Sequence, residues 1–240
     1  MKKHLMTMLA LSLFCLCLGT PAYCQTQQRP VYLDQPVQVK VIGEINPGEK
    51  YPLLIFLPFT TGSADKYFSF VSPHTGLDNY IAVIPHGTAQ LTDYLPDFYS
   101  YMKWYEKRLM TDLPEILKAY PVDRNRIYIS GYSLGGDLSW ALLIRQKELF
   151  AGALIIGSRC SYVPNSKDLK YLKQHGRRFV LLMGDRDLPD RAKGMDNAAR
   201  LAKKNGLAVW HQQFQGAHDI PNGQELRKAF DLLTDSKTAE

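Results

Sequence analysis

A serine flanked by glycines, in Gly131-Tyr132-Ser133-Leu134-Gly135-Gly136, is the segment of this chain with the clearest capacity for chemistry. Residues 126–130 before it are rich in β-branched and aromatic side chains, which predicts a buried strand. Residues 138–149 after it carry apolar side chains at helical spacing and no proline, which predicts a helix. A strand, a tight turn with serine at its tip and a helix form a nucleophile elbow, which exposes the hydroxyl and directs backbone N–H groups at a reacting oxygen.

A serine hydroxyl needs a base within hydrogen-bond reach, and position along the chain separates the six histidines. Three are poorly placed, in the predicted N-terminal signal segment, a basic stretch and a predicted strand: His4, His175 and His211. His218 directly follows the last predicted strand, and we expect it to be the base. His86 also follows a strand and is the rival, while His74 stays a further candidate.

A base needs a carboxylate to orient it, and Gly184-Asp185-Arg186-Asp187-Leu188-Pro189-Asp190 supplies three candidates after another predicted strand. Asp187 is the best placed, three residues beyond the glycine, where the chain can turn back towards the base. Asp185 and Asp190 are interpreted as turn-formers or as partners for Arg186 and Arg191. An acidic turn without a catalytic role is the alternative for the whole segment. The predicted catalytic residues are therefore Ser133, Asp187 and His218, in that chain order.

The elements that must position these residues alternate between strand and helix. Strands are predicted at 52–57, 80–84, 127–130, 151–156, 179–183 and 208–214, and helices at 101–120, 138–149, 169–174, 192–205 and 224–233. Pro114 predicts a kink or restart in the first helix, and the alternating residues 37–42 predict an antiparallel edge strand. Such alternation gives a mostly parallel sheet with helices on both faces, and ligands bind at the carboxyl ends of its strands.

From Pro52 onwards the chain resembles α/β-hydrolase esterases, particularly secreted enzymes of the polyhydroxybutyrate-depolymerase and feruloyl-esterase type. Residues 122–136 resemble the aspartate–arginine lead into their elbow, and residues 184–187 and 216–219 resemble their acid and histidine loops. The resemblance implies an α/β-hydrolase fold without a large cap domain, and acyl transfer to water through an acyl-serine. It also implies an acyl or feruloyl ester on a polysaccharide, or a hydroxyalkanoate, as the substrate.

One segment departs from that family pattern. These esterases carry His-Gly and further glycines after the first of the strands above, where the backbone supplies an oxyanion donor. Here the residues are Pro58-Phe59-Thr60-Thr61-Gly62-Ser63, and proline has no N–H. The donor must then come from Phe59 or Thr60, and we expect Thr60 to act together with the Leu134 N–H as the oxyanion hole.

The substrate pocket is harder to derive from the sequence. Residues 93–104 are unusually aromatic for a loop and either wall the site or pack on the fold. The residues we expect to line the pocket are Phe59, Tyr132 and Tyr99. Cys160 is interpreted as a buried small residue rather than a nucleophile, and Arg159 as a surface arginine. No ligand spacing suggests a metal and no phosphate loop is present, so we expect no cofactor.

The N-terminus predicts export. A basic start and an apolar run to Leu18 precede small residues, which is the layout of a signal peptide over residues 1–24 and too short for a comfortable membrane span. Cleavage after Ala22 fits nearly as well, and a lipid-bearing Cys24 is the weaker alternative. Residues 25–240 then form one domain of a secreted or periplasmic protein, with Cys160 as its one cysteine.

The formal net charge is +6, and the densest basic stretch, residues 167–178, is interpreted as a solvated helix face. Nothing in the sequence favours a nucleic-acid partner, and the expected partner is an ester substrate, small or polymeric. Two other functions stay open: a serine peptidase on the same fold, and a non-catalytic carbohydrate- or surface-binding protein with a degenerate hydrolase fold.

Overall fold

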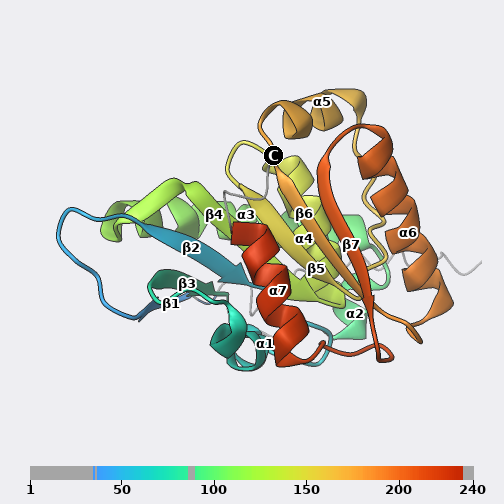
Figure 1. Cartoon of the computed structure of the whole chain (residues 1–240), viewed down its shortest axis with the longest axis horizontal. Helices are drawn as coiled ribbons and strands as arrows, with labels where there is room; N and C mark the ends of the chain where they lie inside the picture. The colour runs from blue at the N-terminus through green and yellow to red at the C-terminus, as the bar shows by residue number, and fades with distance from the viewer. Residues whose placement is uncertain (1–34, 36, 86–89, 235–240) are drawn as a thin grey trace, which may run out of the picture.

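A single seven-stranded sheet organises the described part of the chain, with the strand order β1-β3-β2-β4-β5-β6-β7 (Figure 1). The computed structural model describes residue 35, residues 37–85 and residues 90–234. The strands are β1 (Gln38–Ile42), β2 (Tyr51–Phe56), β3 (Tyr80–Ile84), β4 (Val122–Tyr132), β5 (Gly152–Ile156), β6 (Arg178–Gly184) and β7 (Ala208–Phe214). All strand pairs are parallel except β1 with β3, so the predicted antiparallel edge strand is confirmed.

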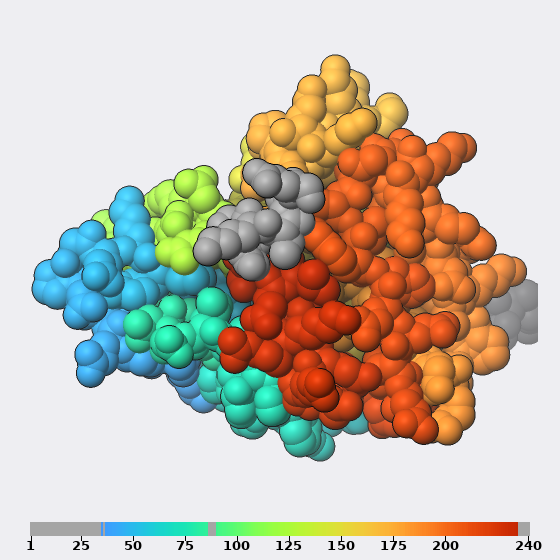
Figure 2. All heavy atoms as spheres, viewed as in Figure 1, coloured from blue at the N-terminus to red at the C-terminus, as the bar shows by residue number. Residues whose placement is uncertain are grey.

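Helices cover both faces of this sheet, as predicted. They are α1 (Ala64–Val71), the 3-10 helix η2 (Ser72–His74), α2 (Leu91–Tyr94), α3 (Phe98–Ala119), α4 (Leu134–Arg145), α5 (Ser166–Gln174), α6 (Pro189–Lys204) and α7 (Gly223–Thr234). One hydrophobic core joins α3, α4, α5 and α6 to the sheet, and a second joins α1 and α7 to the opposite face. Figure 2 shows that second face, where α7 lies beside the segment formed by α1 and η2.

The central strands are buried on both faces because each is covered by helices. All six residues of β2, all five of β3 and all five of β5 are buried, and each of these segments is an apolar run without polar alternation. This is the pattern expected for parallel strands between two helical layers. The site-bearing loops therefore emerge from a rigid, densely packed support.

Several element boundaries differ from the predicted ones. Helix α1 was not predicted, and α3 begins at Phe98 because the Asp97 side chain accepts a hydrogen bond from the Ser100 N–H and caps it. Helix α3 continues without a break through Pro114. Helix α4 begins at Leu134, directly after the serine, and ends at Arg145, earlier than the predicted 138–149.

Some predictions concern residues outside the described ranges. The signal peptide over residues 1–24, including Cys24, is one of them, and the rival base His86 is another. Within the described ranges, none of the helices has both the length and the apolar character that a membrane crossing requires.

Stability at mildly acidic pH should depend on His211, which lies in β7. Burial lowers the pKa of this imidazole below 6.5, although Asp196 lies 3.7 Å away and acts in the opposite direction. Below pH 6.5 the His211 imidazole therefore binds a proton more readily in the unfolded chain than in the folded protein, and the free energy of unfolding decreases as the pH falls. We expect the melting temperature to drop less between about pH 7.5 and pH 5.5 in His211→Gln than in wild type. The exposed His175→Gln is the control, and an equal drop in all three proteins would contradict the assignment.

Candidate active site

Ser133 occupies the turn between β4 and α4 in a backbone conformation that non-glycine residues seldom adopt. Its φ is 57° and its ψ is −115°, and the residue is buried. The turn is tight enough that a Cβ at Gly131 would overlap the backbone of Gly135. A Cβ at Gly136 would lie 2.6 Å from the Ile156 carbonyl oxygen. The predicted elbow is therefore present, and its glycines are required by backbone-to-backbone contact rather than by flexibility.

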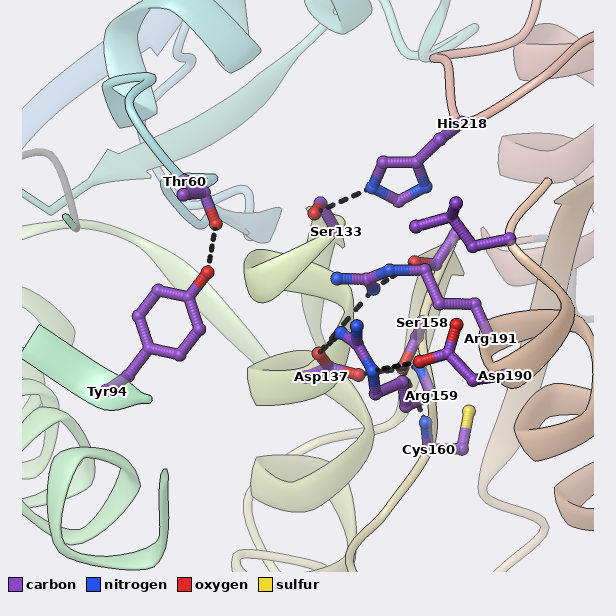
Figure 3. A network of polar contacts seen from close by, with 12 residues as sticks. Thr60, Tyr94, Ser133, Asp137, Ser158, Arg159, Cys160, Asp190, Arg191 and His218 are labelled. Atoms are coloured by element: carbon purple, nitrogen blue, oxygen red, sulfur yellow. Dashed lines mark hydrogen bonds and ion pairs between the residues drawn. The ribbon is translucent and has the colours of Figure 1, made fainter. Parts of the chain in front are cut away.

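The structure brings Ser133, Asp187 and His218 into one chain of hydrogen bonds. The His218 Nε2 lies 2.9 Å from the Ser133 Oγ, and its Nδ1 lies 3.0 Å from the Asp187 Oδ2 (Figure 3 shows the contact with Ser133). A carboxylate can only accept, so Nδ1–H donates to Asp187, and Nε2 is left as the acceptor for the serine hydroxyl. This is the geometry that general-base activation of a serine requires.

The loop after β6 fixes Asp187 and separates it from the other two candidate carboxylates. The Asp187 side chain is 1% exposed, and its Oδ1 also accepts the Leu188 N–H at 2.6 Å. Asp185 accepts the Gly216 N–H at 2.9 Å and so ties this loop to the histidine loop. Asp190 forms an ion pair with Arg159 at 2.7 Å rather than with its neighbour Arg191, and this contact lowers the pKa of the Asp190 carboxyl.

Tyr132 holds the histidine loop, a role that the sequence did not indicate. Its hydroxyl donates to the His218 carbonyl oxygen, and the two ring centroids lie 4.9 Å apart. Burial raises the pKa of Tyr132 to about 12, so the phenol stays protonated and remains a donor at any ordinary pH. The residue before the nucleophile thus positions the base as well.

The segment after β2 forms a tight turn on the other side of the serine. The Phe59 N–H donates to the Gly62 carbonyl oxygen at 3.1 Å, which removes Phe59 as an oxyanion donor. The side chain of Thr60 is held by the hydroxyl of Tyr94 on α2, 2.7 Å away. In Figure 3, Thr60 and His218 lie on opposite sides of Ser133. Of the two predicted donors, this leaves the Thr60 N–H as the candidate.

A cavity of about 730 Å³ is bounded by chain neighbours of the serine, Thr60 and the histidine, although Ser133, Thr60 and His218 themselves are not part of its wall. Phe59 and Tyr132, two of the three predicted pocket residues, belong to its wall. The lining residues are Phe59, Lys66, Phe70, His74, Tyr132, Phe214, Gln215, Gly216, Asp219, Ile220, Pro221, Asn222, Gly223 and Leu226. Tyr99, the third, is not among them; it is 48% exposed at the start of α3, with its ring 6.4 Å from that of Tyr162.

The expected aromatic loop at residues 93–104 is largely helical, which explains the position of Tyr99. The segment is shared between α2 and the first turns of α3, and Tyr94 and Tyr101 are buried in the core. Cys160 is buried, as predicted, and burial raises the pKa of its thiol, which makes it a poor nucleophile. No group of three metal-ligating side chains is found within residues 37–85 and 90–234.

Comparison with known proteins identifies solved structures that share the fold of this chain. No family model and no curated protein matches the sequence. Among solved structures, a carboxylesterase from Bacillus cereus is 18% identical with a TM-score of 0.62, over 82% of this chain and 93% of that chain. A ferulic acid esterase is 17% identical with a TM-score of 0.54, over 82% and 96%. The acylaminoacyl peptidase of Pyrococcus horikoshii is 15% identical with a TM-score of 0.57, over 83% and 41%.

This chain has the α/β-hydrolase fold. The resemblance derived from the sequence is confirmed at that level, and the described part of the chain contains no large cap domain. At these identities the likeness concerns architecture, so the activity must be argued from the site itself.

The close backbone contact at the elbow predicts how a substitution of Gly131 affects the free energy of unfolding. Gly131→Ala should lower the free energy of unfolding by about 3 kcal/mol and reduce any activity, because its Cβ meets backbone that cannot move aside. Gly48→Ala is the control, since it meets open space and adds only the cost of a φ of 85°, about 1–2 kcal/mol. Urea denaturation measures both, and equal losses would show that the close approach at Gly131 is not limiting.

Proposed function

We propose that this protein is a serine esterase that hydrolyses carboxylic esters through an acyl-Ser133 intermediate. The observation that carries the proposal is the hydrogen-bonded chain from Ser133 through His218 to Asp187. It joins a nucleophile, a base and an orienting carboxylate in the order Ser–Asp–His along the chain. The fold shared with a carboxylesterase and a ferulic acid esterase supports the same reaction class.

In the acylation half of this mechanism, the Ser133 Oγ attacks the ester carbonyl carbon and its proton passes to the His218 Nε2. The buried Asp187 carboxylate stabilises the imidazolium through Nδ1–H. When the tetrahedral intermediate collapses, the C–O bond to the alcohol breaks and His218 returns the proton to the leaving oxygen. The acyl group stays on Ser133.

In the deacylation half, water replaces the alcohol. His218 takes a proton from the water, the resulting hydroxide attacks the acyl carbon, and the carboxylic acid leaves as the proton returns to the Ser133 Oγ. Both halves place negative charge on the carbonyl oxygen. We assign the Leu134 N–H, at the start of α4, and the Thr60 N–H as the donors that stabilise this charge.

The cavity beside Tyr132 has a mixed wall and supports a substrate group that is only partly hydrophobic. Its hydrophobic lining residues are Phe59, Phe70, Tyr132, Phe214, Ile220, Pro221 and Leu226, and its polar ones include Lys66, His74 and Asp219. Its volume is in the range that holds a small organic molecule. An aromatic acid ester, or an acyl chain of several carbons, is therefore the substrate class we propose.

The decisive variant is Ser133→Ala. Wild type should hydrolyse p-nitrophenyl butyrate and react covalently with a fluorophosphonate probe, and Ser133→Ala should lose the labelling and at least about a thousandfold in turnover. The matched control is Ser161→Ala, an exposed serine on the loop after β5, which should retain both. Turnover by Ser133→Ala equal to that of wild type would overturn the proposal.

A serine peptidase is the second candidate, because the fold is also shared with an acylaminoacyl peptidase. The same three residues can cleave amides as well as esters, so the substrate panel must contain both. Acetate, butyrate, octanoate and ferulate esters, set against peptide p-nitroanilides, separate the two candidates. If the fluorophosphonate probe labels Ser133 but no substrate of the panel is hydrolysed, the nucleophile is intact. That result would exclude the alternative of a non-catalytic binding protein.

The oxyanion assignment is tested by two substitutions at one position. Thr60→Ala keeps the backbone N–H and loses the hydroxyl contact with Tyr94, whereas Thr60→Pro removes the N–H as well. We expect kcat to fall by on the order of 10²–10³ in Thr60→Pro and by far less in Thr60→Ala, with similar melting temperatures. Equal kcat values in the two variants would show that the Thr60 N–H is not the oxyanion donor.

Export is part of the proposal and rests on the sequence of residues 1–24 alone. The basic start, apolar run and small residues are typical of a signal peptide. We therefore propose a secreted or periplasmic esterase, which N-terminal sequencing of the processed protein would test.

A further inference from the structure

Behind the serine, a buried arginine connects three of the segments that build the site. Arg191 lies in the first turn of α6, four residues after Asp187, and its side chain is 6% exposed. Its Nη1 donates to the Gly157 carbonyl oxygen at 2.6 Å and lies 3.7 Å from the Asp137 Oδ2. Asp137 is on α4, one turn after the serine, and its N–H donates to the Ser133 carbonyl oxygen. Figure 3 shows this network beneath Ser133 and His218.

Gly157 packs directly against the imidazole of His218 and the carboxylate of Asp187. A Cβ at this position would lie 3.1 Å from the His218 ring and 3.3 Å from the Asp187 Oδ2, and its φ of 57° suits glycine. The peptide carbonyl that Arg191 binds is therefore in the residue that touches both members of the acid–base pair. A shift of Gly157 would move the His218 ring relative to the Ser133 Oγ.

Asp137 fixes the other end of the same segment. Its Oδ1 accepts the Ser158 hydroxyl and the Arg159 N–H, both at 2.7 Å. Burial raises the pKa of the Asp137 carboxyl, and the positive charge of Arg191 opposes that rise. The guanidinium and the carboxylate thus hold residues 157–159 from two sides.

The geometry of this pair favours a role in positioning over one in folding stability. The closest approach of Arg191 to Asp137 is an ion pair without a hydrogen bond, and the buried Arg191 Nε has no hydrogen-bond partner among the described residues. By contrast, Arg145 on α4, the helix of Asp137, forms a bidentate pair with Glu106 of α3 at 2.7–3.0 Å. A buried charge with incomplete partners costs desolvation energy that its attraction repays poorly.

We propose that Arg191 is a positioning residue that holds Gly157, and through it His218 and Asp187, in register with the Ser133 elbow. The inference rests on the proposed esterase function. It goes beyond that function by adding a residue that touches no reacting atom but sets the distance across which the serine proton moves. Displacements of about 1 Å in such a site cost on the order of 10²-fold in rate.

The test compares Arg191→Met, Arg191→Lys and Arg145→Met in ester hydrolysis. Arg191→Met keeps a long apolar stem without the donors, and Arg191→Lys keeps one charged donor for the Gly157 carbonyl. We expect kcat to fall about 10–100-fold in Arg191→Met with KM changed less than about threefold, and to recover in part in Arg191→Lys. Arg145→Met breaks a partly buried pair at the far end of α4, roughly 18 Å along the helix from Ser133, and should lower the melting temperature but leave kcat within about twofold.

Asp137→Asn is the second variant, because it keeps an acceptor for the Ser158 hydroxyl and the Arg159 N–H and removes the charge that faces the side chains of Arg191 and Arg159. It should lower kcat several-fold at unchanged KM. Wild-type kcat in both Arg191→Met and Asp137→Asn, or a kcat loss in Arg145→Met as large as in Arg191→Met, would overturn the positioning role. A wild-type protein without Ser133-dependent turnover would instead overturn the proposed function, so the two failures are distinguishable.

Discussion

The site depends on one strained turn. Ser133 has a left-handed φ of 57°, which costs about 1–3 kcal/mol and persists only where the surroundings over-determine it. Here the surroundings are the backbones of β4 and α4, which approach so closely that a Cβ at Gly131 would overlap the backbone of Gly135. The same approach presents the hydroxyl above the sheet and the first N–H groups of α4 beside it. The strain, the orientation of the Ser133 hydroxyl and one half of the proposed oxyanion site therefore have a common cause.

The parallel sheet brings site residues that are far apart in the sequence close together in space. Ser133 and His218 are 85 residues apart, yet they meet because β4 and β7 lie in the same sheet with their carboxyl ends at one edge. The strands β2, β4, β5, β6 and β7 are successive neighbours, and each is followed by a segment with a separate role: the Thr60 turn, the serine, Gly157, the acid loop and the histidine loop. Since the β5 segment sits between the serine and the acid, whatever holds Gly157 also sets the distance across the site.

The sequence predicted the parts of this architecture that follow from local patterns. Apolar runs located the strands, and the loops directly after them contained Asp187 and His218. Helix α1 was missed although Ser63 caps it and its buried residues Ala64, Tyr67, Phe68 and Val71 have helical spacing. The roles of Tyr132, Tyr94 and Arg191 had no local signal. Each depends on a contact between segments far apart in the chain, such as the hydroxyl of Tyr132 reaching the carbonyl of His218.

The departure at Pro58 from the esterase pattern has a structural explanation in the same strained turn. A Cβ at Gly135 would lie 2.8 Å from the Pro58 carbonyl oxygen, so the end of β2 and the start of α4 are in direct backbone contact. Proline supplies no donor there, but its fixed φ makes the chain stiff where it leaves the sheet. The tight turn from Phe59 to Gly62 then carries Thr60, and the Tyr94 hydroxyl anchors its side chain. If Thr60 supplies the proposed oxyanion donor, a rigid proline and an anchored threonine take the place of the glycine-rich segment of these esterases, because such a donor needs a fixed position.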